Sequence, residues 1–320
     1  TRVTRPVFIV SGFLGAGKTS LILSLIRRGS IRDAVLIVND FGDISLDAQL
    51  IASSGETVVE LQSGCICCSA KDDLIKSLHD IAQSHPDKKS VWIETSGISS
   101  PGDLLPLFTS NPVIASNFFV EQVITVVDSR TSVEDLSRAG TVFEQLAFAS
   151  TIFVNIFDDY CEPSSKLLEW LRSVNSAANY LIAPIDDIEL SQLKSGFDYR
   201  FSLERTDHLV AMNNGIKEHG FQTFTIRWEG SIIISDLSTI LDDWLMSDGK
   251  NLLRMKGVAF CEESNLSIII QGVRRQIIFD EPSNMDWSEG GFLVLIGSEI
   301  DQESIERLET LIHDSQVLKI

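Results

Sequence analysis

The chain has 320 residues and a formal net charge of −19, from 26 Lys and Arg against 45 Asp and Glu. This length exceeds one typical core and fits about two domains. The acidic charge argues against nucleic acids and anionic membrane surfaces as partners, because both need clustered Lys and Arg. No apolar run approaches the ~20 residues of a membrane span, and the N-terminal residues lack the layout of a signal peptide. We therefore expect a cytoplasmic protein.

The first part of the chain alternates short apolar segments with amphipathic ones. A helix is predicted over Lys18–Arg28, because its apolar residues recur at helical spacing. The predicted strands are rich in Val and Ile: Val7–Ser11, Val35–Val38, Val58–Leu61, Val91–Glu94, Val123–Val127 and Ile152–Asn155. Strands that are apolar throughout are typical of a sheet buried on both faces. Their alternation with helices predicts an α/β fold with a mostly parallel sheet and right-handed crossovers.

The strand–helix rhythm is lost after about residue 190, where Gly196, Asn213, Asn214 and Gly215 indicate a connector. We predict an α/β domain at 1–195, a linker at 196–220 and a smaller α+β domain at 221–320. The last domain is predicted to contain strands at Phe221–Trp228, Leu253–Phe260, Leu266–Gly272 and Phe292–Ile296, and helices at Asp236–Leu245 and Gln302–Ile312.

The segment from Gly12 to Thr19 reads GFLGAGKT and fits the phosphate-loop pattern G-x-x-x-x-G-K-[ST]. It follows a predicted strand and opens a predicted helix, so its N–H groups and the helix dipole favour a bound phosphate chain. Lys18 is expected to reach the β and γ phosphates and Thr19 to bind magnesium. The predicted nucleotide-binding residues of this segment are Gly12, Gly15, Ala16, Gly17, Lys18, Thr19 and Ser20. The fold expected is that of a P-loop nucleoside triphosphate hydrolase.

Two further segments place carboxylates after predicted strands. Glu94 begins the sequence ETSG, where it is predicted to orient water or to support the magnesium shell, and Gly97 to let the backbone approach the γ-phosphate. A helix cap or a turn is the alternative interpretation. Asp40 and Asp43 flank Phe41-Gly42, where they either sense magnesium or cap a loop. Lys18, Glu94 and Asp43 are the predicted catalytic residues.

Three of the five cysteines, Cys65, Cys67 and Cys68, lie within four residues. They sit between a predicted strand and a helix whose start, Ser69 to Asp72, has a capping-box pattern. A helix N-terminus lowers the pKa of thiols, and thiolates suit zinc, with copper(I) also possible. At most three sulfurs are available, which favours an exchangeable metal over a structural one. Buried, inert thiols are the alternative, which is also our interpretation of the isolated Cys161 and Cys261.

These pieces in this order resemble the CobW-type metallochaperone GTPases, relatives of the urease and hydrogenase nickel-insertion GTPases. The resemblance rests on Gly12–Thr19, Asn39–Asp47 (NDFGDISLD), Gly64–Cys68 (GCICC), Glu94–Pro101 (ETSGISSP), Gln145–Ala149 (QLAFA) and, in the second domain, Leu253–Gly257, Gln271–Gly272, Trp287 and Ile296–Gly297.

The resemblance implies a GTPase that delivers zinc, cobalt or iron to a client apo-metalloprotein. It implies that Cys65, Cys67 and Cys68 bind this metal, while Lys18 and Thr19 hold the phosphates and magnesium. Asp40 and Asp43 would then belong to the switch region, and Glu94 would link the nucleotide to the metal site. The resemblance permits a monomer and a homodimer alike.

The base-reading motif of the family, N-K-x-D, is here Asn155-Ile156-Phe157-Asp158. Asn155 and Asp158 keep their places, and Asp158 can still accept hydrogen bonds from guanine. Ile156 supplies no cation, which predicts weaker guanine binding, selectivity relaxed toward ATP, or slow turnover. Two other functions therefore stay open. One is a P-loop small-molecule kinase, and the other is a metalloenzyme activator or scaffold with weak turnover, similar to the activators of nitrile hydratases.

Overall fold

The computed structural model describes residues 4–38, 57–60, 69–157, 162–193, 221–261, 264, 266–274, 276–280 and 290–317. The chain divides into two compact units. The first comprises Thr1–Leu168 and Ala178–Phe197, and the second comprises Glu169–Ala177 and Asp198–Ile320.

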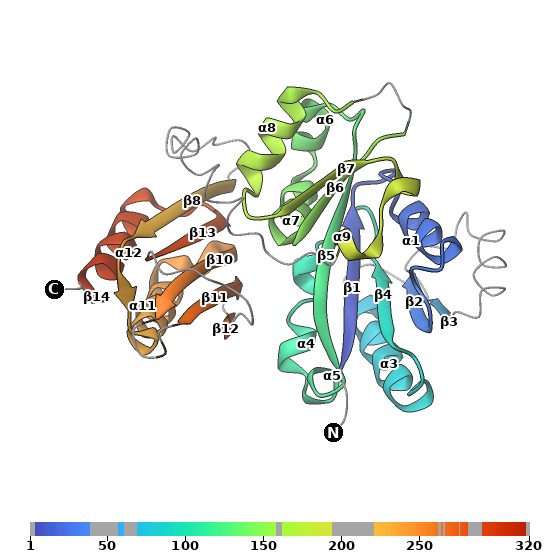
Figure 1. Ribbon diagram of the computed structural model, residues 1–320, viewed down its shortest axis with the longest axis horizontal. Coiled ribbons are helices and arrows are strands. Elements are labelled where there is room, and N and C mark those ends of the chain that lie inside the picture. Colours follow the sequence, from blue (N-terminus) through green and yellow to red (C-terminus); the bar gives the residue numbers. More distant parts are fainter. Residues whose placement is uncertain are drawn as a thin grey trace. The chain divides into compact units, whose positions relative to one another are not determined.

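A seven-stranded sheet forms the first unit, in the strand order β3-β2-β4-β1-β5-β6-β7 (Figure 1). Every neighbouring pair in it is parallel. The strands are β1 (Arg5–Gly12), β2 (Ala34–Val38), β3 (Thr57–Glu60), β4 (Ser90–Glu94), β5 (Phe118–Asp128), β6 (Thr151–Asn155) and β7 (Asn179–Ala183). Because all strands run the same way, their carboxyl ends meet at one edge of the sheet, which is where ligands bind in open α/β sheets.

Helices connect these strands. Their bounds are α1 (Lys18–Arg27), α3 (Ser69–Ser84), α4 (Leu107–Ser110), α5 (Pro112–Ala115), α6 (Val133–Arg138), α7 (Gly140–Phe148), α8 (Ser165–Val174) and α9 (Leu190–Leu193), with short 3₁₀ turns η1 (Pro101–Asp103) and η2 (Ile185–Asp187). The predicted helix over Lys18–Arg28 thus ends one residue earlier.

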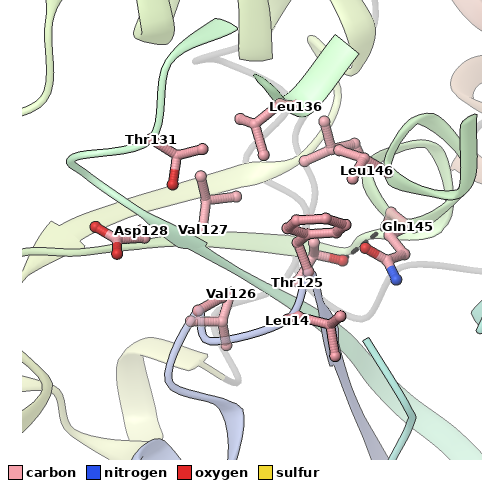
Figure 2. Close-up of a pocket in the computed structure, with 12 residues that line it drawn as sticks. Leu14, Thr125, Val126, Val127, Asp128, Thr131, Leu136, Gln145 and Leu146 are labelled. Atoms are coloured by element: carbon pink, nitrogen blue, oxygen red, sulfur yellow. Dashed lines mark hydrogen bonds between the residues drawn. The ribbon is translucent and has the colours of Figure 1, made fainter. Parts of the chain in front are cut away.

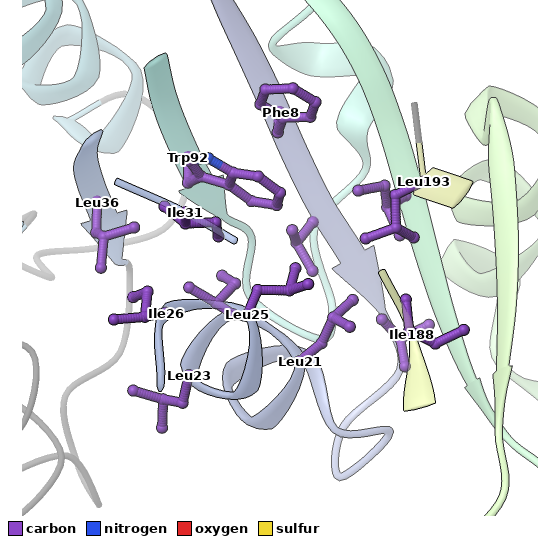
Figure 3. Packing of buried hydrophobic residues seen from close by; sticks show 14 of the residues in the cluster. Phe8, Leu21, Leu23, Leu25, Ile26, Ile31, Leu36, Trp92, Ile188 and Leu193 are labelled. Atoms are coloured by element: carbon purple, nitrogen blue, oxygen red, sulfur yellow. The ribbon is translucent and has the colours of Figure 1, made fainter. Parts of the chain in front are cut away.

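The core of the first unit includes a cluster between α1 and the sheet (Figure 3). Leu21 and Leu25 of α1 are fully buried in it. Phe8 of β1 and Trp92 of β4 stack with ring centroids 4.3 Å apart. This packing fixes α1 against the strands that precede the phosphate loop and the Glu94 segment, so the two segments keep a constant relative position.

The second unit is built on an antiparallel sheet in the order β12-β11-β10-β13-β8; in addition, β9 pairs with β10, and β14 pairs with β9. Its strands are β8 (Phe221–Trp228), β9 (Ser231–Ile232), β10 (Leu252–Cys261), β11 (Leu266–Val273), β12 (Gln276–Asp280), β13 (Gly291–Ser298) and β14 (Gln316–Val317). Helices α11 (Ile234–Ser247) and α12 (Gln302–Asp314) flank it, with a 3₁₀ turn η4 (Gly249–Asn251) after α11. Trp244 of α11 donates a buried hydrogen bond to Ser304 of α12 at 2.8 Å.

The predicted fold class, a P-loop α/β domain with a smaller α+β domain, is therefore confirmed. Within the described part of the chain, no helix is both long and apolar enough to cross a membrane.

Candidate nucleotide site

The phosphate loop joins β1 to α1 at the carboxyl edge of the parallel sheet. Gly12, Gly15 and Gly17 have φ angles of 138°, 74° and 100°. Gly12 pairs with Val126 of β5, and a Cβ at Gly12 would lie 2.2 Å from the Val126 carbonyl oxygen. A side chain is thus excluded at Gly12 both by its backbone conformation and by the neighbouring strand.

Lys18 folds back over this loop. Its Nζ donates to the carbonyl oxygens of Gly12 at 2.9 Å and of Phe13 at 3.1 Å. Burial lowers the pKa of the Lys18 ammonium, and the nearby Glu94 carboxylate partly opposes that shift. The only charged group of the loop segment is therefore held at the loop itself, where a phosphate chain would meet it.

Thr19 and Glu94 are in direct contact. The Thr19 hydroxyl, in the first turn of α1, donates to Oε1 of Glu94 at 2.7 Å, although the two residues are 75 positions apart. Glu94 ends β4 and lies beside Val10 of β1 in the sheet. A hydroxyl and a carboxylate are hard oxygen ligands of the kind that magnesium prefers, so this pair fits the ion that accompanies a nucleoside triphosphate.

The segment after Glu94 lies against the phosphate loop. The Thr95 N–H donates to the Val10 carbonyl oxygen at 2.9 Å. A Cβ at Gly97 would lie only 2.7 Å from the backbone nitrogen of Leu14. A glycine at this position therefore permits the close approach of the two backbones.

A small pocket lies beside this contact, between the phosphate loop, the carboxyl end of β5 and helices α6 and α7 (Figure 2). Leu14, Val127, Leu136 and Leu146 give it a largely apolar wall. Gln145 enters its lining from α7 (Figure 2).

The segment expected to read the base lies at the end of β6. Asn155 is buried, and its Nδ2 donates to the Ala16 carbonyl oxygen at 3.4 Å. Phe157 is 39% exposed, and the Arg130 guanidinium lies over its ring, 4.0 Å from the centroid. Arg130 also donates to the Asp128 carboxylate at 2.8 and 3.0 Å. Arg130 thus places a cation on Phe157, the residue that follows Ile156 in the altered motif.

Arg130 and Phe157 were not among the predicted site residues. Phe157 lies inside the altered motif, where an exposed aromatic side chain is itself a signal for stacking. Arg130 comes from the loop after β5, and no local pattern marks it.

The predicted residues Lys18, Thr19, Glu94, Gly97 and Asn155 thus meet at one edge of the sheet. Ser20 follows Thr19 in α1 and is exposed. The remaining predictions lie outside the described residues: Asp40, Asp43, Asp158, Cys65, Cys67 and Cys68. Within the described ranges there is no group of three or more His, Cys, Asp or Glu that would hold a metal. Cys261 is a buried thiol in β10.

Comparison with known proteins gives matches to both units. The nucleotide-binding domain of the CobW/HypB/UreG family matches residues 6–181, and the C-terminal domain of the cobalamin synthesis protein CobW matches residues 221–311. The chain is 27% identical to the zinc chaperone YjiA of Escherichia coli over 312 residues, 93% of this chain and 96% of the relative. It is also 27% identical over 355 residues to the zinc-regulated GTPase metalloprotein activator 1 of Saccharomyces cerevisiae, 95% of this chain and 82% of the relative.

The fold is shared with a solved structure. The crystal structure of Zn(II)-bound YjiA GTPase from E. coli superposes with a TM-score of 0.71 at 19% identity, covering 98% of this chain and 100% of that chain. With the phosphate loop, the Thr19–Glu94 contact and both domain matches in place, the chain belongs to the CobW/HypB/UreG family of nucleotide-binding proteins.

Proposed function

We propose that this protein is a GTP-dependent metallochaperone. It takes up a transition metal, with zinc favoured over cobalt or iron, at Cys65, Cys67 and Cys68, and passes it to a client apo-metalloprotein as GTP is hydrolysed. The observation that carries the proposal is the hydrogen bond between Thr19 and Glu94 beside Lys18, because it joins the groups needed for magnesium and phosphate. The names of the relatives, a zinc chaperone and a zinc-regulated GTPase metalloprotein activator, support the choice of metal and client.

The chemistry of the site follows from its charges. Thr19 would hold the magnesium ion, which would supply neutralisation of phosphate charge and orientation of the triphosphate. Lys18 exchanges its two carbonyl acceptors for phosphate oxygens, which offer it a full counter-charge. Glu94 accepts hydrogen bonds at the end of β4, where it orients the water that attacks the γ-phosphate.

The topology offers a route for coupling the nucleotide to the metal. The three cysteines lie in the chain between the end of β3, Glu60, and the start of α3, Ser69. β3 pairs with β2, and β2 pairs with β4, which ends at Glu94. The cysteine segment and the nucleotide site thus start from the same edge of the sheet. Ordering of the segments after β2 and β4 by GTP would change how the thiols meet the metal.

We also propose that different segments of the chain have different functions. Residues 1–195 bind nucleotide and metal, 196–220 form a linker, and 221–320 recognise the client. Client binding should be lost when 221–320 are deleted, measured by co-purification of the client with a chain that retains its GTPase activity. Unchanged client binding would exclude this role for the C-terminal domain.

Hydrolysis of GTP and ATP with magnesium tests the proposed activity. Thr19→Val replaces the hydroxyl with a methyl group, and Glu94→Gln replaces the carboxylate with a neutral amide, so each should lower kcat/KM for GTP about 100-fold or more. The matched control is Ser24→Ala, which removes an α1 hydroxyl that donates to Asp186 at 2.8 Å. This control should stay within about twofold of the wild type. Turnover that requires a small-molecule acceptor would favour a kinase instead, and wild-type protein without turnover would favour a scaffold.

A further inference from the structure

Gln145 connects helix α7 to the segment that follows Glu94. Its side chain is fully buried, and its Nε2 donates to the carbonyl oxygens of Gly97 at 3.0 Å and Ser99 at 3.1 Å. The helix around it also contacts β5, where the Thr125 hydroxyl donates to the Gln145 carbonyl oxygen at 2.7 Å (Figure 2). One buried side-chain amide thus binds two nearby backbone carbonyls, which lie 48 and 46 residues earlier in the chain.

The turn from Ser96 to Ser99 is closed by its own hydrogen bonds. The Ser99 N–H donates to the Ser96 carbonyl oxygen at 3.0 Å, and the Ile98 N–H donates to the Ser96 hydroxyl at 3.4 Å. Gln145 takes the carbonyls of Gly97 and Ser99. Among the residues that the structure describes, the Gly97 N–H has no acceptor. Gly97 is also the residue of this turn that lies against Leu14 of the phosphate loop.

The orientation of the Gln145 amide is determined by its surroundings. Both contacts on the Gly97 side are carbonyl oxygens, so only the NH₂ end fits there. Its Oε1 is buried and has no hydrogen-bond partner within the described residues. An apolar side chain of similar size would avoid this unsatisfied acceptor, so packing alone does not account for an amide here. The amide instead fixes the position of the Gly97–Ser99 turn through its two hydrogen bonds.

We propose that Gln145 is a positioning residue for recognition of the terminal phosphate. Its amide holds the Gly97–Ser99 turn against the phosphate loop, so that the Gly97 N–H is presented to the γ-phosphate of a bound nucleoside triphosphate. Such a preorganised donor discriminates triphosphate from diphosphate, since a diphosphate leaves it without an acceptor. The inference rests on the proposed function, because it requires that the site binds GTP.

Equilibrium titrations with GDP and with a slowly hydrolysed GTP analogue plus magnesium test this role. Gln145→Met keeps the size of the side chain and removes both N–H donors. It should weaken binding of the analogue about tenfold, while the affinity for GDP stays within about twofold. Gln145→Glu, whose carboxylate has no N–H, should act in the same way. Thr125→Val is the matched control, because it removes a hydroxyl bond to the Gln145 backbone and leaves the amide in place. It should keep the preference for the analogue.

The outcomes separate the two proposals. Wild-type protein that binds neither nucleotide would overturn the proposed function and the role of Gln145 together. A wild type that prefers the analogue, with Gln145→Met and Gln145→Glu either keeping that preference or losing both affinities equally, would overturn only the role of Gln145. Hydrogen exchange on the wild type needs no variant: the Gly97 amide should be protected by the analogue and not by GDP. Equal protection by both nucleotides would contradict the proposal.

Discussion

The proposed phosphate side and the proposed base side of the nucleotide site are built differently. On the phosphate side, Lys18, Thr19 and Glu94 make hydrogen bonds of 2.7 to 3.1 Å to one another or to the loop. On the base side, Asn155 makes a longer contact of 3.4 Å, and the exposed Phe157 is covered by Arg130 from another loop. The first side is held by short hydrogen bonds at the ends of the adjacent strands β1 and β4, and the second is assembled from the loops after β5 and β6. Substitutions should therefore cost most on the phosphate side and change selectivity on the base side.

The largest effect is expected at Gly12. Gly12→Ala would place a Cβ 2.2 Å from the Val126 carbonyl oxygen, at a φ of +138°. Gly15→Ala is the matched control, because its φ of +74° is strained while no atom lies within 4 Å of the added Cβ. We expect Gly12→Ala to lower the free energy of unfolding by more than about 4 kcal/mol and Gly15→Ala by about 1 kcal/mol, measured by urea denaturation. Equal losses would contradict the close packing of the loop on β5.

Lys18 should show its lowered pKa in the pH dependence of stability. In the unfolded chain its pKa is about 10.4, and burial lowers it in the folded protein. Between the two pKa values the unfolded state binds more protons, so the contribution of Lys18 makes the free energy of unfolding rise with pH across this window. Lys18→Met should remove that rise and also abolish GTP hydrolysis. The matched control is Lys89→Met, at an exposed side chain paired with Asp33, which should keep both. A slope unchanged in Lys18→Met would contradict burial as the cause.

On the base side, Phe157→Ala should weaken GTP and ATP about fivefold alike, since a base stacked on an aromatic ring gains about 1–3 kcal/mol whatever its identity. The affinity for inorganic tripolyphosphate, which has no base, should not change. Competition titrations with the three ligands measure this. A loss of tripolyphosphate affinity would mean that Phe157 acts on the phosphate loop through Gly17. A Cβ added at Gly17 would lie 3.8 Å from the Phe157 ring.

The smallest effect is expected at Ile156, in the altered base-reading motif. Ile156→Lys restores the residue type of the family, and we expect the affinity for GTP relative to ATP to rise a few-fold. The control is Phe119→Lys, another half-exposed apolar position, at the start of β5 and so at the opposite edge of the sheet. If both variants raise the affinities for GTP and ATP equally, the added positive charge acts through the overall electrostatic field of the protein and not through contact with the base.

The phosphate side could be predicted from the sequence because its residues fall in two short segments, Gly12–Thr19 and Glu94–Gly97, and each segment follows a strand that is apolar throughout or nearly so. The contact between Thr19 and Glu94 followed from the topology, since both segments leave adjacent parallel strands at the same edge. The edge strands β7 and β12 were missed. β7 is only half-buried, so it lacks the continuous apolar signature of the central strands.

Two contacts of the site depend on tertiary packing that no local pattern encodes. Arg130 and Phe157 meet across the loops that follow β5 and β6, and Gln145 meets Gly97 and Ser99 from a helix 48 and 46 residues away. In both cases the residue type is compatible with many neighbours, and only the fold selects one. The sequence identified Gln145 as part of a family segment, without indicating what its side chain holds.

A competition titration of zinc affinity tests the central claim, that nucleotide and metal binding are coupled. The protein is measured alone, with GDP, and with a slowly hydrolysed GTP analogue plus magnesium, beside Cys67→Ala and the control Cys261→Ala, whose thiol is buried in β10. A gated carrier predicts that zinc affinity changes at least tenfold between nucleotide states, ~1.4 kcal/mol of coupling. This change should be lost in Cys67→Ala and kept in Cys261→Ala. The same zinc affinity in all three states would contradict the account.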